Sequence, residues 1–169
     1  PKQLDTLRDA VLNAPENPLH HFDLGAFFAE HDYHAEAVNR FRRAAQLQPD
    51  DTRLLNHMGR LLARKRQFDA ALKFYMRTVR IDSTQVEALI SAGNLLTMGG
   101  RSGESLLLFE RALKLHPDNA LARFYYGLAL LKSERRGAAH TALLEALAVA
   151  RDPTLQEQIQ KAIGSTTAR

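Results

Sequence analysis

Apolar residues recur along most of the chain at intervals of three and four positions, the spacing of one face of an α-helix. Between residues 2 and 14, Leu4, Leu7 and Val11 share such a face, and Pro15 ends the pattern. The pair Asn17-Pro18 then provides a capping side chain followed by proline at the first helical position, a typical helix start. The pattern predicts an all-α protein.

The helices are predicted to come in pairs. The first pair covers 18–30 and 35–48, with a short turn at 31–33, and further pairs cover 51–82, 84–117 and 119–151. Asp51 and Asn119 are predicted N-caps, and Thr84 with Glu87 has the spacing of a capping box. A final helix over 154–163 opens after Asp152-Pro153 and is predicted to stop at Gly164, leaving a frayed tail.

Glycine returns at a fixed interval inside these helical stretches. If the four pairs are numbered from Pro18, Thr52, Val86 and Ala120, position 8 is glycine in every pair, and successive pairs start 34 residues apart. A glycine in mid-helix costs about 0.8–1 kcal/mol relative to alanine, so close helix packing must offset it. We expect position 8 to face the small residue at position 20, with large residues at positions 11 and 24 filling the flanking gaps. The position-8 glycines are Gly25, Gly59, Gly93 and Gly127; position 20 holds Ala37, Ala71, Ser105 and Ala139; position 24 holds Phe41, Tyr75, Phe109 and Leu143.

This pattern resembles the tetratricopeptide repeat (TPR) family, in which Leu-Gly, Ala, Phe, Ala and Pro stand at set offsets in a 34-residue period. The chain departs from it at position 4, which lacks tryptophan, and at position 32, where Ser83 and Arg151 replace proline. The resemblance implies a right-handed α-α superhelix, a TPR solenoid of antiparallel helix pairs. The implied organisation is an N-terminal helix or half-repeat at 1–16, four repeats within 17–151 (18–51, 52–85, 86–119 and 120–153), a C-terminal capping helix at 152–164 and a tail at 165–169.

Composition fits a globular protein with a sizeable core, because 45% of the residues are hydrophobic and 25% are charged. The absence of cysteine excludes disulfides and thiolate chemistry. No membrane-spanning run and no signal segment is recognisable, and the start at Pro1-Lys2 suggests a piece of something longer.

Positive charge is concentrated near the centre of the chain. Residues 40–80 hold eleven Lys and Arg against three Asp, whereas the whole chain carries a formal net charge of +4. This concentration suggests an anionic partner, and the alternative is an ordinary arginine-rich helix surface in contact with solvent.

The resemblance implies a binding groove lined by the first helix of each repeat, at positions 2, 5, 9, 12 and 13. In the second repeat, Arg53, Asn56, Arg60 and Arg64 follow one another at steps of 3, 4 and 4, which places them on one helix face. We expect the groove to bind a peptide segment of acidic or carboxylate character between apolar ends. The predicted peptide-binding residues are Phe22, Ala26, Arg53, Asn56, Arg60, Arg64, Ile90, Asn94, Phe124 and Leu128.

The interpretation is therefore a non-enzymatic interaction module or assembly scaffold with no cofactor, catalytic residue or metal site. The glycines of MGGRSGES lack the Lys-Ser or Lys-Thr of a phosphate loop and are assigned to a turn. His20, His21, His31 and His34 do not converge well enough to bind metal. The alternatives are a basic nucleic-acid-binding module, through an arginine column at position 26, or the TPR regulatory part of a larger enzyme. Self-association through the edge left by the opening half-repeat stays open. The position-26 arginines are Arg43, Arg77 and Arg111.

Overall fold

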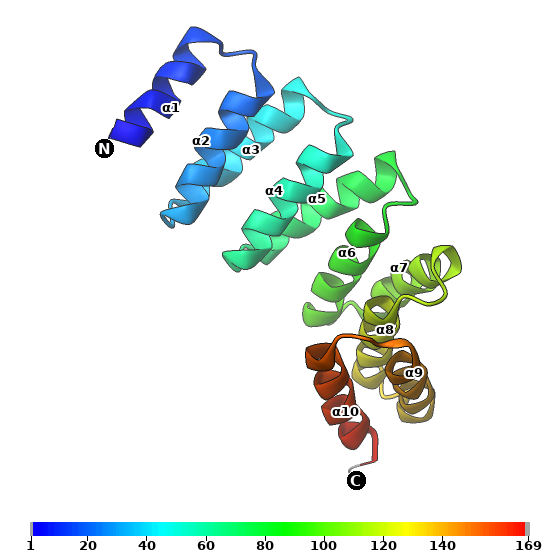
Figure 1. The fold of residues 1–169 in the computed structure, drawn as a ribbon. Helices are drawn as coiled ribbons and strands as arrows, with labels where there is room; N and C mark the ends of the chain where they lie inside the picture. Colours follow the sequence, from blue (N-terminus) through cyan, green and yellow to red (C-terminus); the bar gives the residue numbers. More distant parts are fainter. Residues whose placement is uncertain (1, 168–169) are drawn as a thin grey trace. The chain divides into compact units, whose positions relative to one another are not determined.

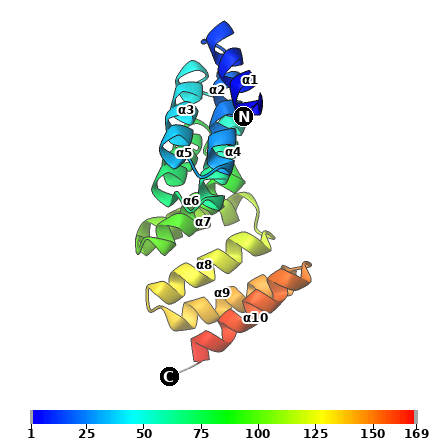
Figure 2. The ribbon, with the colours of Figure 1, turned by 90° about the vertical axis from the view of Figure 1, so that its left-hand side faces the viewer.

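The computed structural model describes residues 2–167, which form ten α-helices and no strand (Figure 1). The helices from α2 to α9 form four antiparallel pairs, and in each pair the two partners pack along one another (Figures 1 and 2). Their bounds are α1 Lys2–Asn13, α2 Pro18–Glu30, α3 His34–Leu47, α4 Thr52–Arg64, α5 Phe68–Ile81, α6 Val86–Met98, α7 Ser102–Leu115, α8 Ala120–Lys132, α9 Arg136–Val149 and α10 Pro153–Thr167.

The helices divide into two compact units, one up to Asp82 and one from Ser83 onward. The first holds α1 to α5, with Leu24, Phe41 and Met58 completely buried. The second holds α6 to α10, and its core includes Leu89 and Phe109.

The recurring glycines make room for the large side chain at position 24. A Cβ atom on Gly25 would lie 2.7 Å from the ring of Phe41, and one on Gly93 would lie 2.7 Å from the ring of Phe109. The expected partner at position 20 is small and fully buried in each pair, but it is not the side chain that glycine admits. The glycine therefore lets an aromatic or leucine side chain of the second helix lie flat against the first.

Each hairpin turn has the same left-handed conformation at position 15. Among the described residues, φ is positive at Asp32, Arg66 and Glu134, with values of 65°, 59° and 59°, and at Gly100 with 77°. In the first turn, the backbone N–H of Tyr33 donates to the oxygen of Phe28 (2.9 Å), and that of Asp32 to Ala29 (3.3 Å). This pair of bonds is the Schellman arrangement, which satisfies carbonyls at a helix end, and it recurs in the other three turns.

Some predicted helix ends differ from the observed ones. The N-cap of α6 is Gln85 and not the predicted Thr84, and the side chain of Gln85 makes no capping hydrogen bond. Gly103 lies inside α7 and not in the preceding turn.

The last helix, α10, continues through Gly164 to Thr167, beyond its predicted end. Hydroxyls of Ser165, Thr166 and Thr167 donate to carbonyls three or four residues earlier, and buried Thr166 also contacts His140 of α9 (2.7 Å), which holds the last turn in place. The final two residues of the predicted tail lie outside the described part of the chain.

Candidate functional site

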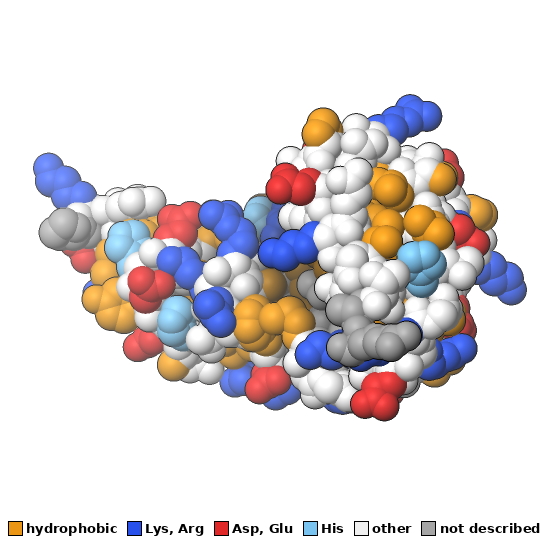
Figure 3. All heavy atoms as spheres, turned by 90° about the horizontal axis from the view of Figure 1, so that it is seen from below, with side chains coloured by type: hydrophobic (Ala, Val, Ile, Leu, Met, Phe, Trp, Pro, Cys, Tyr) orange, Lys and Arg blue, Asp and Glu red, His pale blue; other side chains and the backbone are white. Residues whose placement is uncertain are grey.

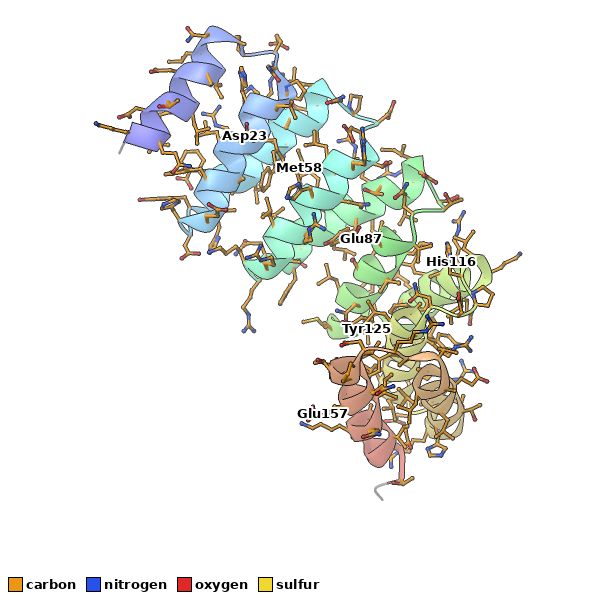
Figure 4. All side chains as sticks on the ribbon, in the orientation of Figure 1. Asp23, Met58, Glu87, His116, Tyr125 and Glu157 are labelled. Carbon is orange, nitrogen blue, oxygen red and sulfur yellow. The ribbon has the colours of Figure 1, made fainter. Side chains whose placement is uncertain are left out.

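In the first unit, the predicted basic residues lie on α4, which packs beside α2. Arg53, Arg60 and Arg64 are all exposed, as their spacing on one helix face predicts. Figure 4 shows α2, on which Asp23 is labelled, beside α4, on which Met58 is labelled. Within the described residues, the guanidinium groups of Arg53 and Arg64 have no partner in the chain, so both are available to an anion.

Phe22 of α2 connects the two helices of this face. Its ring centroid lies 5.7 Å from that of Phe41 and 4.9 Å from that of His57 on α4. Phe22 and Ala26 are both half-buried, so they offer apolar surface beside the arginines.

Asn56 is the one predicted polar residue of this face that is buried, with 8% of its surface exposed. Its Oδ1 has no hydrogen-bond partner among the described residues. A buried amide oxygen without a partner costs roughly 1–3 kcal/mol, a cost that a bound ligand can remove by donating a hydrogen bond.

One end of the face is tied by an ion pair between the turn after α2 and Lys65, the C-cap residue that follows α4. Lys65 Nζ lies 2.9 Å from Asp32 Oδ1 and 3.2 Å from the oxygen of Glu30. The hydrogen bond and positive charge of Lys65 lower the pKa of Asp32 below its ordinary value of 3.8. Asp32 is therefore ionised and neutralises Lys65.

In the second unit, the predicted residues do not share one exposed surface. Ile90 is 7% exposed and Asn94 is half-buried. Phe124 is buried in a cluster with Leu143 of α9 and Ile159 of α10, and Leu128 packs against the same cluster. The apolar side chains of Phe124 and Leu128 are thus used for packing against neighbouring helices. Phe124 is only 6% exposed, so it does not offer the open surface that a peptide-binding residue needs.

A cavity beside Ile90 was not identified from the sequence. It has a volume of about 420 Å³ and lies where α6 and α8 begin and α7 ends, and Figure 4 labels Glu87 and His116, which lie on its wall. The signal that could have located it is Leu121 at position 2, an exposed leucine in the first turn of α8. Its lining residues are Val86, Glu87, Ile90, Ser91, His116, Asn119 and Leu121.

The arginine column at position 26 is partly engaged within the chain. Arg43 forms an ion pair with Glu16 (2.7 Å), and Arg77 donates from Nη2 to the backbone oxygen of Ala45 (2.9 Å). Figure 3, a view from below, shows surface Lys and Arg side chains interspersed with Asp and Glu on that side. Two of the three arginines, Arg43 and Arg77, are thus engaged in polar contacts within the chain.

The histidines of the first repeat have structural contacts. His21 is buried with Nε2 2.8 Å from the oxygen of Pro15, and His31 stacks on Phe27 with ring centroids 4.0 Å apart. Nowhere in residues 2–167 do three or more His, Asp or Glu side chains converge as metal ligands. Every helix in that range is too short or too polar to cross a bilayer.

Comparisons with known proteins identify related sequences and folds. A family model described as tetratricopeptide repeat matches residues 31–86 and 92–155. The chain is 28% identical over 104 residues to protein O-mannosyl-transferase TMTC1 of Mus musculus, a match covering 59% of this chain and 11% of that protein. It is 24% identical over 106 residues to anaphase-promoting complex subunit 3 of Schizosaccharomyces pombe, covering 63% of this chain and 16% of that subunit. The chain thus spans a small part of these relatives.

Solved structures are similar over nearly the whole chain. YrrB, described as a TPR protein with an unusual peptide-binding site, superimposes with a TM-score of 0.77 at 22% identity, covering 95% of this chain and 82% of YrrB. MamA superimposes with a TM-score of 0.72 at 16% identity, covering 94% of this chain and 89% of MamA. At these identities the likeness shows the fold alone, and it confirms the predicted all-α array of antiparallel helix pairs.

Proposed function

Because the chain belongs to the tetratricopeptide repeat family, we propose that it is a protein-interaction scaffold that binds an acidic peptide segment on the face formed by α2 and α4. Protein–protein interaction is the role that the TPR fold suggests. The acidic character of the peptide and its place on this face are the finer parts of the proposal.

The observation that carries the proposal is the set of exposed arginines around a buried, unpartnered amide. Arg53 and Arg64 are available to carboxylates, and guanidinium groups bind carboxylates through two parallel hydrogen bonds. The unpartnered Oδ1 of Asn56 can accept a hydrogen bond from a peptide N–H. An arginine-rich surface that only contacts solvent would have no use for such an acceptor. Basic side chains thus select charge, and the amide selects the polypeptide backbone.

Apolar contacts are provided beside the basic residues. Phe22 and Ala26 offer half-buried surface on α2, suited to an aliphatic or aromatic side chain of the bound segment. In the second unit, taken by itself, we propose contacts at Ile90 and Asn94; Ile90, but not Asn94, lines the cavity of about 420 Å³, which can admit an apolar side chain. Phe124 and Leu128 are left out of the proposed contacts because they pack against the cluster that includes α10.

The similarity to YrrB supports a peptide as the ligand, because YrrB is described as having a peptide-binding site. The arginines argue for the acidic character independently of that similarity. The catalytic activity named for the O-mannosyl-transferase relatives is not part of the proposal, because the match covers only 11% of TMTC1.

Selection from a peptide library tests the proposal directly. We expect the wild-type protein to enrich peptides that are acidic or end in a free carboxylate, and an Arg60→Ala/Arg64→Ala variant to bind them at least about tenfold more weakly. Raising the salt concentration should weaken wild-type binding more than variant binding. An Arg135→Ala/Arg151→Ala variant removes the same charge elsewhere and should bind as the wild type does. Equal binding by all three proteins would contradict the proposed face.

A second candidate function follows from the match to an enzyme. The sequence similarity to protein O-mannosyl-transferase TMTC1 favours a role as the TPR regulatory part of a larger enzyme. In that case the chain alone should show no mannosyl transfer and should bind a segment of the catalytic partner. Transfer activity by the isolated chain would contradict both candidates.

A further inference from the structure

A second pocket lies in the first unit, between the outer helices α3 and α5. Its volume is about 360 Å³, within the range of ordinary ligand pockets. Val38 of α3 and Ala70 and Phe74 of α5 give it apolar lining. The face of α2 and α4 contributes none of its lining residues, so occupancy of this pocket is separable from the function proposed above.

The apolar floor of the pocket is packed against the core of the first unit. Phe74 is only 9% exposed, and its ring meets that of Phe41 edge to face with centroids 6.5 Å apart. Val38 and Ala70 are half-buried beside it. A ligand side chain entering the pocket would therefore meet preformed apolar walls.

The rim of the pocket is mainly cationic. Arg42, Lys73 and Arg77 contribute three positive charges against the single negative charge of Asp69. Arg77 is held in place by its bond to the oxygen of Ala45, and Arg42 donates to Asn39 Oδ1 (3.2 Å). Lys73 has no partner within the described residues and is exposed, so its ammonium group is available to an anion.

We propose that this pocket binds a second peptide segment, one that carries a single aromatic or branched aliphatic side chain flanked by carboxylates. The apolar side chain fills the space above Phe74, and the flanking carboxylates pair with Lys73 and the fixed guanidinium of Arg77. Charge complementarity selects this occupant over a basic or neutral peptide. A nucleic acid fits less well, because the nearly buried Phe74 ring offers no open face on which a base could stack. Together with the function proposed above, on which this step rests, the chain would hold two partner segments at once, one on each of two faces of the first unit.

The test titrates an isotope-labelled full chain with three end-blocked probe peptides. Binding is measured by NMR, as changes in the chemical shifts of the backbone amide signals. The probes are Glu-Glu-Phe-Glu-Glu, the same peptide with Ala in place of Phe, and the same peptide with Gln in place of every Glu. We expect the first probe to shift amides within 38–42 and 67–77, and the other two to bind there at least about fivefold more weakly. Because millimolar binding is visible in such spectra, the absence of these shifts would overturn the proposal.

Variants separate this pocket from the α2–α4 face. Lys73→Glu reverses a rim charge at an exposed position, and Ala70→Leu fills the pocket, so each should reduce binding of the first probe by about fivefold or more. Lys114→Glu makes the same charge change on α7 and should have no effect, and Arg60→Ala/Arg64→Ala should leave these shifts in place. The assignment would be overturned if the shifts persisted in both Lys73→Glu and Ala70→Leu. It would also be overturned if a short oligothymidylate produced the shifts and the peptide did not. Failure of the α2–α4 proposal would leave this result unchanged.

Discussion

Replacing Gly93 by alanine should destabilise the protein, although alanine is the better helix former. A Cβ atom at position 93 would lie 2.7 Å from both Cε1 and Cζ of Phe109, whereas comfortable carbon–carbon contact begins near 3.5 Å. Phe109 is completely buried, so its ring cannot swing into solvent. The helix or the ring must shift by most of an ångström.

The expected magnitude is the balance of two terms. Alanine in mid-helix contributes about 0.8–1 kcal/mol relative to glycine. Overpacking of a filled core costs about 1–3 kcal/mol, and the contact with a rigid ring places this site toward the upper end. The net loss in free energy of unfolding should therefore be about 1–2 kcal/mol, which lowers Tm by several degrees in a protein of this size.

Thermal and urea unfolding of variants from the same repeat measure the effect. Gly103→Ala is the matched control, because Gly103 lies in the first turn of α7 and its Cβ would have nothing within 4 Å; it should raise stability by up to about 0.5–1 kcal/mol. Leucine in place of Phe109 would not be enough, because a Cβ on Gly127 would lie 2.8 Å from Leu143. In a Phe109→Ala background the contact is absent, so Gly93→Ala should there be neutral or stabilise the protein by up to about 1 kcal/mol. A Gly93→Ala protein at least as stable as the wild type would refute the packing argument.

Four further substitutions test the hairpin turns, the ion pair and the buried amide. Glu134→Gly should raise the free energy of unfolding by roughly 0.5–1 kcal/mol in urea titrations, because glycine adopts the φ of 59° without strain, and Gly100→Ala should lower it. Lys65→Met should return the pKa of Asp32 toward 3.8 in an NMR titration. Because that pKa is lowered in the folded state, the ion pair stabilises the protein above about pH 4. This contribution is lost as the pH falls through the folded pKa, and it is absent in the Lys65→Met variant. Asn56→Leu removes the unpartnered Oδ1, so it should raise the free energy of unfolding by about 1 kcal/mol and weaken peptide binding. Lower stability with unchanged binding would show that Asn56 has a packing role only.

The glycine period was enough to predict the helix pairs, because the close contact that requires each glycine lies within a single pair. At each of the four glycines, an added Cβ would lie 2.7 to 2.9 Å from the side chain 16 positions later in the same pair. Every pair therefore needs glycine whatever else it packs against. The left-handed turns were not predicted, because Arg66 and Glu134 give no sequence signal for positive φ, Asp32 is only a weak one, and the third repeat alone uses glycine.

The candidate site was partly predictable for a similar reason. Residue spacing along α4 placed Arg53, Arg60 and Arg64 on one exposed face, since helix geometry alone decides it. The burial of Asn56 and of Phe124 depends on which other elements cover the helix, and repeat positions do not contain that information. The last helix shows this most clearly, because Phe124 occupies a groove position in its repeat but packs in a cluster with Ile159 of α10.

The hairpin turns leave few backbone amides for solvent to reach. In each turn, three consecutive backbone N–H groups are bonded to carbonyls of the preceding helix, the last of them being, for example, Arg101 to Leu96 (2.8 Å) and Arg135 to Leu130 (2.9 Å). Hydrogen exchange at these amides then requires opening of the hairpin and not local fraying. Proteases, which need a stretch of extended chain, should act first in the connectors between pairs, at 48–51, 82–85 and 116–119, and release intact helical hairpins.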